Sequence, residues 1–389
     1  MVSELISQRP YATEAGTARF AARHGALSAP DAYSTVGKML LSSVGLGTYT
    51  GPATDAGDDE YVDAVTDAVR RGINVLDTAS NYRHQRSERA IGRALQGLFE
   101  RGEVYRSELV VASKAGFVPF DGEQPYDPPA FLRSLTVEAG LCDPDELVAG
   151  CHCLAPEFIL STLQQSRRNL GLQTIDVYFL HNPDTQLQTC DRDTVLERLR
   201  RAFAALESAA DQGWIRVYGL ATWSGLRARH HERDFLSLFD VMRVAQEVAG
   251  SRHRFKAVQL PINLAMPEAH TRKNHHHGGD ECSALQAAQR LGLAVFGSSA
   301  LNSGRLGRSA PGHVPPLPPG HGCSHDYEPS VAALQFARSL PGVHTALVGM
   351  RSLANVASNA RVLRVPRAPE PWIHMAAQPL RSGAWTAIR

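Results

Sequence analysis

The chain alternates between short apolar runs and longer segments whose apolar residues recur every three or four positions. The first pattern is typical of buried strands and the second of amphipathic helices. Residues 58–71 illustrate the second, because Tyr61, Val62, Val65 and Val69 fall on one stripe. The predicted strands are 44–47, 73–77, 109–114, 175–181, 217–221, 257–260, 294–298 and 344–348. The predicted helices are 58–71, 87–99 with Ser87 as N-cap, 156–170, 194–212, a segment ending near 249, 283–291, 330–339 and 353–363.

Strands that alternate with helices indicate an α/β fold with a parallel sheet. A doubly wound nucleotide-binding sheet would carry G-x-G-x-x-G after its first strand. The glycines of residues 45–51, GLGTYTG, have a different spacing. We therefore predict a (β/α)8 TIM barrel, preceded by a hairpin or lid at the barrel bottom near residues 37–41.

Three segments lie outside the repeat. Residues 1–31 are polar and rich in small residues, so we expect an N-terminal extension that is poorly ordered. The barrel is predicted over residues 32–365. Residues 116–156, rich in Pro, Gly and acidic residues, interrupt it as an insertion over the C-terminal face, expected to set substrate choice rather than chemistry. Residues 366–389 form a tail that packs across the barrel mouth or extends away.

Titratable groups stand where three predicted strands end. Asp77, Lys114 and His181 close successive apolar runs, and Tyr82 follows on a loop. Burying such groups is costly unless they are used. The C-terminal ends of barrel strands meet at the face where active sites lie. Only four of the 40 Lys and Arg residues are lysine. A lysine at a buried strand end of such a chain therefore indicates a chemical requirement for Lys114.

Composition argues against a nucleic-acid partner, a membrane partner and a secreted, disulfide-linked protein. Hydrophobic residues make up 43% and charged residues 20%, which are globular values. A net charge of +1 gives no support for a nucleic-acid or membrane partner. The chain has no run of 18 apolar residues and no signal-peptide core in residues 1–10, so we expect a cytoplasmic location. Its six cysteines fit no disulfide framework.

Several segments together make the chain resemble the aldo-keto reductase superfamily over residues 35–363. They are residues 45–48 (GLGT), 77–82 (DTASNY), 113–114 (SK), 176–181 (DVYFLH), 213–220 (GWIRVYGL), Gln259 with 263–264 (NL), and 349–351 (GMR) with Asn359. The resemblance implies hydride transfer between NADP(H) and a small carbonyl or alcohol substrate, with NAD(H) as the alternative cofactor. It also implies a catalytic tetrad: Tyr82 as general acid/base, Lys114 lowering the Tyr82 pKa, Asp77 holding Lys114, and His181 polarising the carbonyl.

The resemblance also assigns contacts to the cofactor. Gln259 matches the amide that binds the nicotinamide carboxamide, and Arg351 matches the position beside the 2′-phosphate of NADP. Ser298 stands where many members carry an aromatic that stacks on the nicotinamide. The implied cofactor-binding residues are Gly47, Thr48, Asp77, Thr222, Gln259, Ser299, Leu301, Arg351 and Asn359. Aromatic residues expected to wall the substrate pocket include Tyr49, Tyr126 and Trp223, with Phe117, Phe120, Phe131 and Trp372 as further candidates.

Two metal-like motifs have simpler interpretations. Residues 151–153, Cys-His-Cys, lack a fourth ligand and the usual spacing of a zinc site, so we expect a structural role. Residues 275–277 are three adjacent histidines on a predicted surface loop, which cannot all face one ion. No metal is expected.

Alternative functions remain open. A sugar or alcohol dehydrogenase working oxidatively could use the same tetrad. A nicotinamide-binding regulatory subunit resembling potassium-channel β-subunits could keep the fold and serve a partner protein. A metal hydrolase barrel would need a His-x-His on strand one, and residues 44–47, VGLG, have none.

Overall fold

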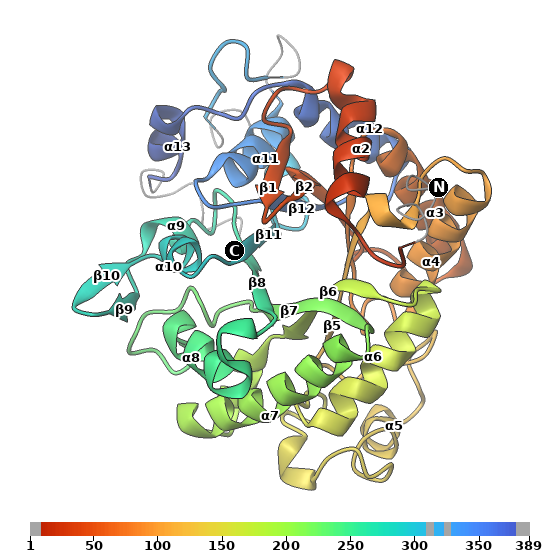
Figure 1. Cartoon of the computed structure of the whole chain (residues 1–389), viewed down its shortest axis with the longest axis vertical. Coiled ribbons are helices and arrows are strands. Elements are labelled where there is room, and N and C mark those ends of the chain that lie inside the picture. The colour runs from red at the N-terminus through yellow and green to blue at the C-terminus, as the bar shows by residue number, and fades with distance from the viewer. Residues whose placement is uncertain (1–8, 309–314, 323–327, 379–389) are drawn as a thin grey trace.

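The computed structural model describes residues 9–308, 315–322 and 328–378, and its centre is a closed barrel of eight parallel strands (Figure 1). Neighbouring strands follow chain order, and β12 pairs with β3 to close the ring. The predicted (β/α)8 barrel is confirmed. Its strands are β3 (Val44–Gly47), β4 (Val75–Asp77), β5 (Val110–Ala115), β6 (Ile175–His181), β7 (Ile215–Ala221), β8 (Phe255–Pro261), β11 (Ala294–Ser298) and β12 (Thr345–Gly349).

Helices surround the barrel and bury one face each against it (Figure 1). Local signals set several of their ends. The Thr54 hydroxyl accepts from Gly57 N–H at the start of α3, and Gly171 ends α6 with a left-handed φ of 65°. The principal helices are α3 (Asp55–Arg70), α4 (Arg86–Glu100), α6 (Pro156–Leu170), α7 (Arg192–Asp211), α8 (Leu238–Ala249), α10 (Ala284–Arg290), α11 (Pro329–Ser339) and α12 (Leu353–Ala360). Short helical turns are η1 (Gly25–Leu27), η2 (Arg106–Glu108), η4 (Pro183–Gln188), η5 (Gly250–Arg252), η6 (Leu306–Arg308) and η7 (Arg361–Arg364).

One predicted helix start was wrong. Gln85, at φ 69°, is the residue before α4, so Ser87 already lies inside the helix. The Ser87 hydroxyl instead donates a 2.8 Å hydrogen bond to the Thr48 carbonyl oxygen. This bond ties α4 to the loop after β3.

The barrel bottom is closed by the N-terminal segment. The predicted hairpin is present as β1 (Tyr33–Val36) and β2 (Met39–Ser42). The extension expected to be poorly ordered instead contains α2 (Glu14–His24), capped by Thr13, with Phe20 fully buried. A Cβ at Gly16 would lie 2.0 Å from the Ser107 carbonyl oxygen, so only glycine lets α2 pack this closely. Residues 1–8 lie outside the described part of the chain.

The C-terminal segment packs on the outside of the barrel. Helix α13 (Glu370–Ala376) lies against α11, and the Trp372 indole N–H donates to the Pro316 carbonyl oxygen at 2.8 Å. The expectation that Trp372 walls a pocket is therefore wrong, because its ring is buried in this outer contact. Residues 379–389 of the predicted tail lie outside the described residues.

The insertion of residues 116–156 begins and ends in one place. Phe117 and His152 form an antiparallel bridge, and α5 (Pro128–Ser134) and η3 (Pro144–Glu146) lie between them. Arg201 pairs with Glu146 at 2.8 Å, which attaches the returning segment to α7.

The three adjacent histidines lie in a hairpin. It consists of β9 (His275–His277) and β10 (Asp280–Cys282) and follows the short helix α9 (Glu268–Thr271). The surface position predicted for all three is wrong for His275, whose side chain is fully buried between Leu238 N–H and the Leu226 carbonyl oxygen. Over the described ranges, none of the helices combines the length and the apolar character required to cross a membrane.

Candidate active site

A cavity of about 900 Å³ opens at the C-terminal ends of the barrel strands. Its lining comes from the ends of all eight barrel strands and from the loops that follow them. Of the predicted catalytic residues, Asp77, Tyr82 and His181 line this cavity, while Lys114 lies behind them with no exposed surface. The predicted cofactor residues that line it are Gly47, Thr48, Asp77, Thr222, Gln259, Ser299, Leu301, Arg351 and Asn359.

Lys114 and Asp77 form a buried ion pair at the ends of β5 and β4. The Lys114 ammonium lies 2.9 and 2.8 Å from the two carboxylate oxygens of Asp77 and donates to the Thr78 carbonyl oxygen at 2.8 Å. Gln259 of β8 adds a 2.8 Å hydrogen bond from its amide to Asp77 Oδ1. Burial lowers the pKa of Lys114, whereas the Asp77 carboxylate favours its charged form.

The expected contact between Lys114 and the Tyr82 hydroxyl takes another form. An ammonium has three donors, and the three hydrogen bonds to Asp77 and Thr78 use them. Lys114 Nζ lies instead 4.8 Å from the centroid of the Tyr82 ring, a cation–π arrangement. Lys114 is therefore expected to act on Tyr82 through its charge across a buried contact, where charges interact more strongly than in water.

Tyr82 keeps its proton firmly in this setting. Burial, followed by the Asp77 carboxylate and Tyr49, raises the pKa of Tyr82 well above its ordinary value. This direction is opposite to the lowering expected from Lys114, because burial of the ring and the nearby carboxylate outweigh the lysine charge. The Tyr49 ring stands 5.0 Å from that of Tyr82, centroid to centroid, in an edge-on contact.

His181 is held neutral beside Tyr82. Burial lowers the pKa of His181 well below its ordinary value, and Lys114 and His152 add to that change. Its ring lies 5.7 Å from the Tyr82 ring and 5.3 Å from the Phe117 ring, edge-on in both cases. A neutral imidazole has one N–H donor, which suits it to polarise a carbonyl oxygen without first losing a proton.

The loop that carries Tyr82 has an unusual backbone. Arg83, His84 and Gln85 all have positive φ, at 49°, 58° and 69°. Such conformations are costly for residues other than glycine and persist only when surrounding contacts hold them. These three positions directly join Tyr82 to α4.

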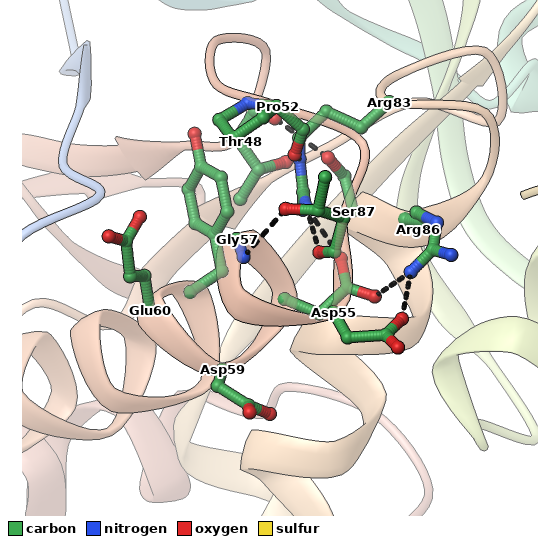
Figure 2. A network of polar contacts seen from close by, with 12 residues as sticks. Thr48, Pro52, Asp55, Gly57, Asp59, Glu60, Arg83, Arg86 and Ser87 are labelled. Carbon is green, nitrogen blue, oxygen red and sulfur yellow. Dashed lines mark hydrogen bonds and ion pairs between the residues drawn. The ribbon is translucent and has the colours of Figure 1, made fainter. Parts of the chain in front are cut away.

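Two arginines supply those contacts (Figure 2). The buried Arg83 side chain donates to the Pro52 carbonyl oxygen at 2.9 Å and to Asp58 at 2.5 Å. Arg86 pairs with Asp55 at 2.8 Å and Asp58 at 2.6 Å. The Tyr82 loop is thereby fixed to the loop after β3 and the first turn of α3, a network that sequence reasoning missed.

Of the aromatic residues predicted to wall the cavity, Tyr49, Trp223 and Phe117 lie in its lining and Tyr126 does not. Tyr49 and Trp223 line it and are 66% and 52% exposed, so they stand at its mouth. Tyr126 was predicted to join them, but its side chain is fully exposed and is absent from the described lining. Phe117 lines the cavity. Lining residues absent from the predicted site include Asn81, Asn182, Arg308, Asn355 and Ser358; the first two directly adjoin Tyr82 and His181 in sequence.

Two polar atoms of residues that line the cavity could hydrogen-bond to a bound amide or ribose. Within the described residues, Thr222 Oγ1 and Asn81 Oδ1 are buried and have no hydrogen-bond partner in the protein. Buried polar groups are nearly always paired, so such atoms point to a ligand or water. Arg351 and Arg308 bring positive charge to the same cavity. The lining thus offers a dinucleotide both unpaired polar atoms and positive charge.

Arg351 already has a partner in the protein. Its Nε lies 3.2 Å from the Glu60 carboxylate of α3, and both side chains are partly exposed. A phosphate that approaches Arg351 would therefore meet Glu60 as well.

The sequence matches one known protein family. The model of the "Aldo/keto reductase family" matches residues 43–309, well over half of the chain. The chain belongs to the aldo/keto reductase family. Over 148 residues it is 31% identical to an "NADH-specific methylglyoxal reductase" of Escherichia coli, covering 37% of this chain and 39% of that protein. Over 167 residues it is 29% identical to a "D-threo-aldose 1-dehydrogenase" of Pseudomonas sp, covering 42% and 44%. These matches span less than half the length of the curated relatives.

Solved structures of the family share the fold. A glycerol dehydrogenase from Gluconobacter oxydans aligns with a TM-score of 0.60 at 19% identity, over 91% of this chain and 99% of that one. An aldo/keto reductase from Klebsiella pneumoniae, solved in complex with NADP and acetate, aligns with a TM-score of 0.55 at 19% identity, over 90% and 96%. At 19% identity, the likeness to these two structures shows a shared barrel fold.

Within this family member, the histidine of the Cys-His-Cys motif has no metal-like surroundings. Across residues 9–308, 315–322 and 328–378, no three His, Cys, Asp or Glu side chains gather as a metal ion would require. His152 is buried and contacts the backbone of His181 instead.

Proposed function

We propose that this chain is an NADP(H)-dependent oxidoreductase of the cytoplasm that transfers a hydride between nicotinamide C4 and a carbonyl or alcohol substrate. The observation that carries the proposal is that Asp77, Tyr82, Lys114 and His181 come from the ends of three neighbouring strands, β4, β5 and β6, and lie together beside the cavity. A buried lysine, a tyrosine and a neutral histidine around a polar opening provide what carbonyl reduction requires.

Tyr82 would act as the general acid. Its raised pKa keeps the hydroxyl protonated at neutral pH, so the proton is available when charge develops on the carbonyl oxygen. Lys114, 4.8 Å from the ring centroid, would stabilise the tyrosinate that remains. Asp77 holds that lysine in place from the other side.

His181 would orient the substrate. As a neutral group with a strongly lowered pKa, it can donate one hydrogen bond to the carbonyl oxygen. Tyr49, Phe117 and Trp223 would pack against the rest of the substrate at the mouth of the cavity. Aromatic walls with a few polar groups are typical of small-molecule sites.

A bound nicotinamide nucleotide would supply or accept the hydride. Thr222, Gln259 and Asn81 would hold its nicotinamide end, because two of these side chains carry buried oxygens without a partner. Arg351 and Asn359 would contact the adenosine end. Arg351 favours NADP(H), while NAD(H) stays an alternative; the names of relatives mention both cofactors.

Replacing Tyr82 tests the proposal. Tyr82→Phe should lower the turnover of 4-nitrobenzaldehyde with NADPH by at least a hundredfold and leave the NADPH dissociation constant, measured by fluorescence, within about twofold of wild type. Tyr126→Phe is the matched control, since it removes an exposed hydroxyl outside the described cavity lining. A Tyr82→Phe enzyme within tenfold of wild type, about 1.4 kcal/mol in barrier, would refute the role of Tyr82.

The same assay separates the alternative functions. A dehydrogenase that works oxidatively would favour alcohol and NADP⁺ at neutral pH, which the raised pKa of Tyr82 opposes. A regulatory subunit would bind the nucleotide tightly but turn over no carbonyl. The first result would set the direction of the proposed reaction, and the second would replace the proposal.

A further inference from the structure

His152 lies at the end of the insertion and is fully buried next to the catalytic strand β6. Its Nε2 is 2.8 Å from the His181 carbonyl oxygen. Its Nδ1 is 2.7 Å from Nε2 of Gln186 in η4. The motif that resembled a metal ligand set thus places an imidazole between two protein groups.

The chemistry of these partners fixes the protonation of His152. A carbonyl oxygen only accepts hydrogen bonds, so Nε2 carries the proton. The Gln186 amide nitrogen only donates, so Nδ1 is bare. The Gln186 side-chain oxygen in turn accepts from the guanidinium of Arg198, which sets the orientation of the amide. Burial lowers the pKa of His152 to about 4, which keeps this neutral tautomer at physiological pH.

These hydrogen bonds have one direction. They run from Arg198 on α7 through Gln186 to His152, and end on the His181 carbonyl. Arg198 and Gln186 are also buried. In such surroundings a fully paired network holds its members rigidly.

The peptide that follows His181 is held on both sides. Its carbonyl accepts from His152, and its N–H, on Asn182, donates to the Ala221 carbonyl oxygen of β7 at 2.5 Å. Asn182 has a left-handed φ of 50°. The strand therefore ends in a defined turn directly after the catalytic histidine.

Gly116 lets these segments meet. A Cβ at this position would lie 2.6 Å from the His181 carbonyl oxygen and 3.0 Å from His152 Nε2, and its φ is 150°. The Phe117 ring packs edge-on against both imidazoles, 4.9 Å from His152 and 5.3 Å from His181. One imidazole of the insertion thus supports the backbone of His181 and a wall of the cavity.

We propose that His152 is a positioning residue for His181, and that the insertion is consequently part of the catalytic apparatus. The inference rests on the proposed role of His181. It departs from the expectation that residues 116–156 affect substrate choice rather than chemistry, because their last segment contacts the peptide of a predicted tetrad residue. His152 touches no substrate; it sets the direction in which the His181 ring presents its N–H.

Two amide variants separate positioning from simple packing. In His152→Gln, the side-chain nitrogen can take the place of Nε2 and still donate to the His181 carbonyl. In His152→Asn, the shorter amide reaches the place of Nδ1 and keeps the contact with Gln186 only. Cys151→Ala, a half-buried neighbour in the same insertion, is the matched control.

The positioning role predicts a split between these variants. His152→Asn should lower kcat for 4-nitrobenzaldehyde about tenfold or more, with the NADPH dissociation constant within twofold of wild type. His152→Gln and Cys151→Ala should stay within threefold in kcat. Hydrogen exchange at the Asn182 amide should be faster in His152→Asn and unchanged in His152→Gln.

The opposite outcomes are equally clear. Unchanged kcat and unchanged Asn182 exchange in His152→Asn would overturn the inference, and so would equal losses in the Asn and Gln variants. If His152→Asn does not fold, His152→Leu tests the same bond, because it removes the donor to the His181 carbonyl oxygen and keeps an apolar side chain beside Phe117. That variant should show the same fall in kcat, and an unchanged kcat there would overturn the inference. Wild-type protein that binds NADPH but reduces no carbonyl would contradict the proposed function itself.

Discussion

At the scale of single residues, the site depends on one buried charge pair. Lys114 has no exposed surface, and both carboxylate oxygens of Asp77 accept hydrogen bonds from its ammonium group. Breaking such a pair leaves one charge buried without a partner, which typically costs about 3–5 kcal/mol of stability. Under the proposed function, catalysis and folding would therefore both depend on the same contact.

Replacement of Lys114 should separate charge from geometry. Lys114→Met should abolish carbonyl reduction and lower the free energy of unfolding by about 3 kcal/mol, since Asp77 keeps only the Gln259 hydrogen bond. Lys114→Arg should keep much of the stability but should not restore turnover, because the guanidinium is larger and planar. Urea unfolding and steady-state kinetics on both variants provide the measurement. Wild-type turnover in the Arg variant would show that a positive charge alone suffices there.

Residue types at the strand ends could be predicted from sequence, but their contacts could not. Asp77, Lys114 and His181 stood out because polar groups rarely end buried strands. The direction of the Tyr82 pKa was missed, since burial of the ring and the position of Asp77 are properties of the fold. Tyr126 was misassigned because aromatic character alone does not tell which way an insertion turns its side chains.

At the scale of elements, apolar runs predicted most strands because both faces of a barrel strand are buried. Helix 156–170 and strand 294–298 have the predicted bounds. The start of α4 differed because Arg83 and Arg86 hold the preceding residues in left-handed conformations through contacts with another loop. Helix α2 was missed because it depends on packing against Ser107, far along the chain.

An ion pair joins α3 to the loop between β12 and α12, at the predicted site of the cofactor's 2′-phosphate. Glu60 of α3 holds Arg351 at 3.2 Å and would compete with a 2′-phosphate for its guanidinium. Arg351→Ala should weaken NADPH binding about tenfold or more and NADH binding little, because a charge-assisted hydrogen bond contributes about 1.5–3 kcal/mol. Glu60→Gln should strengthen NADPH binding several-fold and leave NADH nearly unchanged.

Asp59→Asn controls for the loss of one negative charge on the same helix. Asp59 pairs with Arg93 rather than with Arg351, and Figure 2 shows both acidic side chains on α3. Fluorescence titration of both nucleotides against the four proteins gives the comparison. Equal effects of the Glu60 and Asp59 changes would mean that the net negative charge of α3 governs the preference for NADPH over NADH. Equal losses of affinity for NADPH and NADH in Arg351→Ala would mean that Arg351 does not bind the 2′-phosphate.

At the scale of the whole molecule, several histidines are buried in neutral form. Burial lowers the pKa of both His152 and His275 to about 4, and lowers that of His181 well below its ordinary value. The unfolded chain binds protons at these positions from about pH 6.5 downward. It therefore takes up more protons than the folded chain between pH 6.5 and about 4, and stability falls as the pH is lowered through that window. The raised pKa of buried Glu88 acts in the opposite direction.

The contribution of one histidine can be isolated from this sum. A pKa lowered from 6.5 to about 4 means that His152 alone reduces the free energy of unfolding by ~2 kcal/mol when the pH falls from 7 to 5. His152→Gln removes that titration and keeps a donor for the His181 carbonyl. The drop in the free energy of unfolding from pH 7 to pH 5, measured by urea denaturation, should therefore be smaller by ~2 kcal/mol in His152→Gln than in wild type. Because Glu88 and the other buried groups are common to both proteins, their contributions cancel in this difference. Equal drops in the two proteins would mean that His152 takes up a proton near pH 6.5 while still folded, which is incompatible with a bare Nδ1 facing the Gln186 amide.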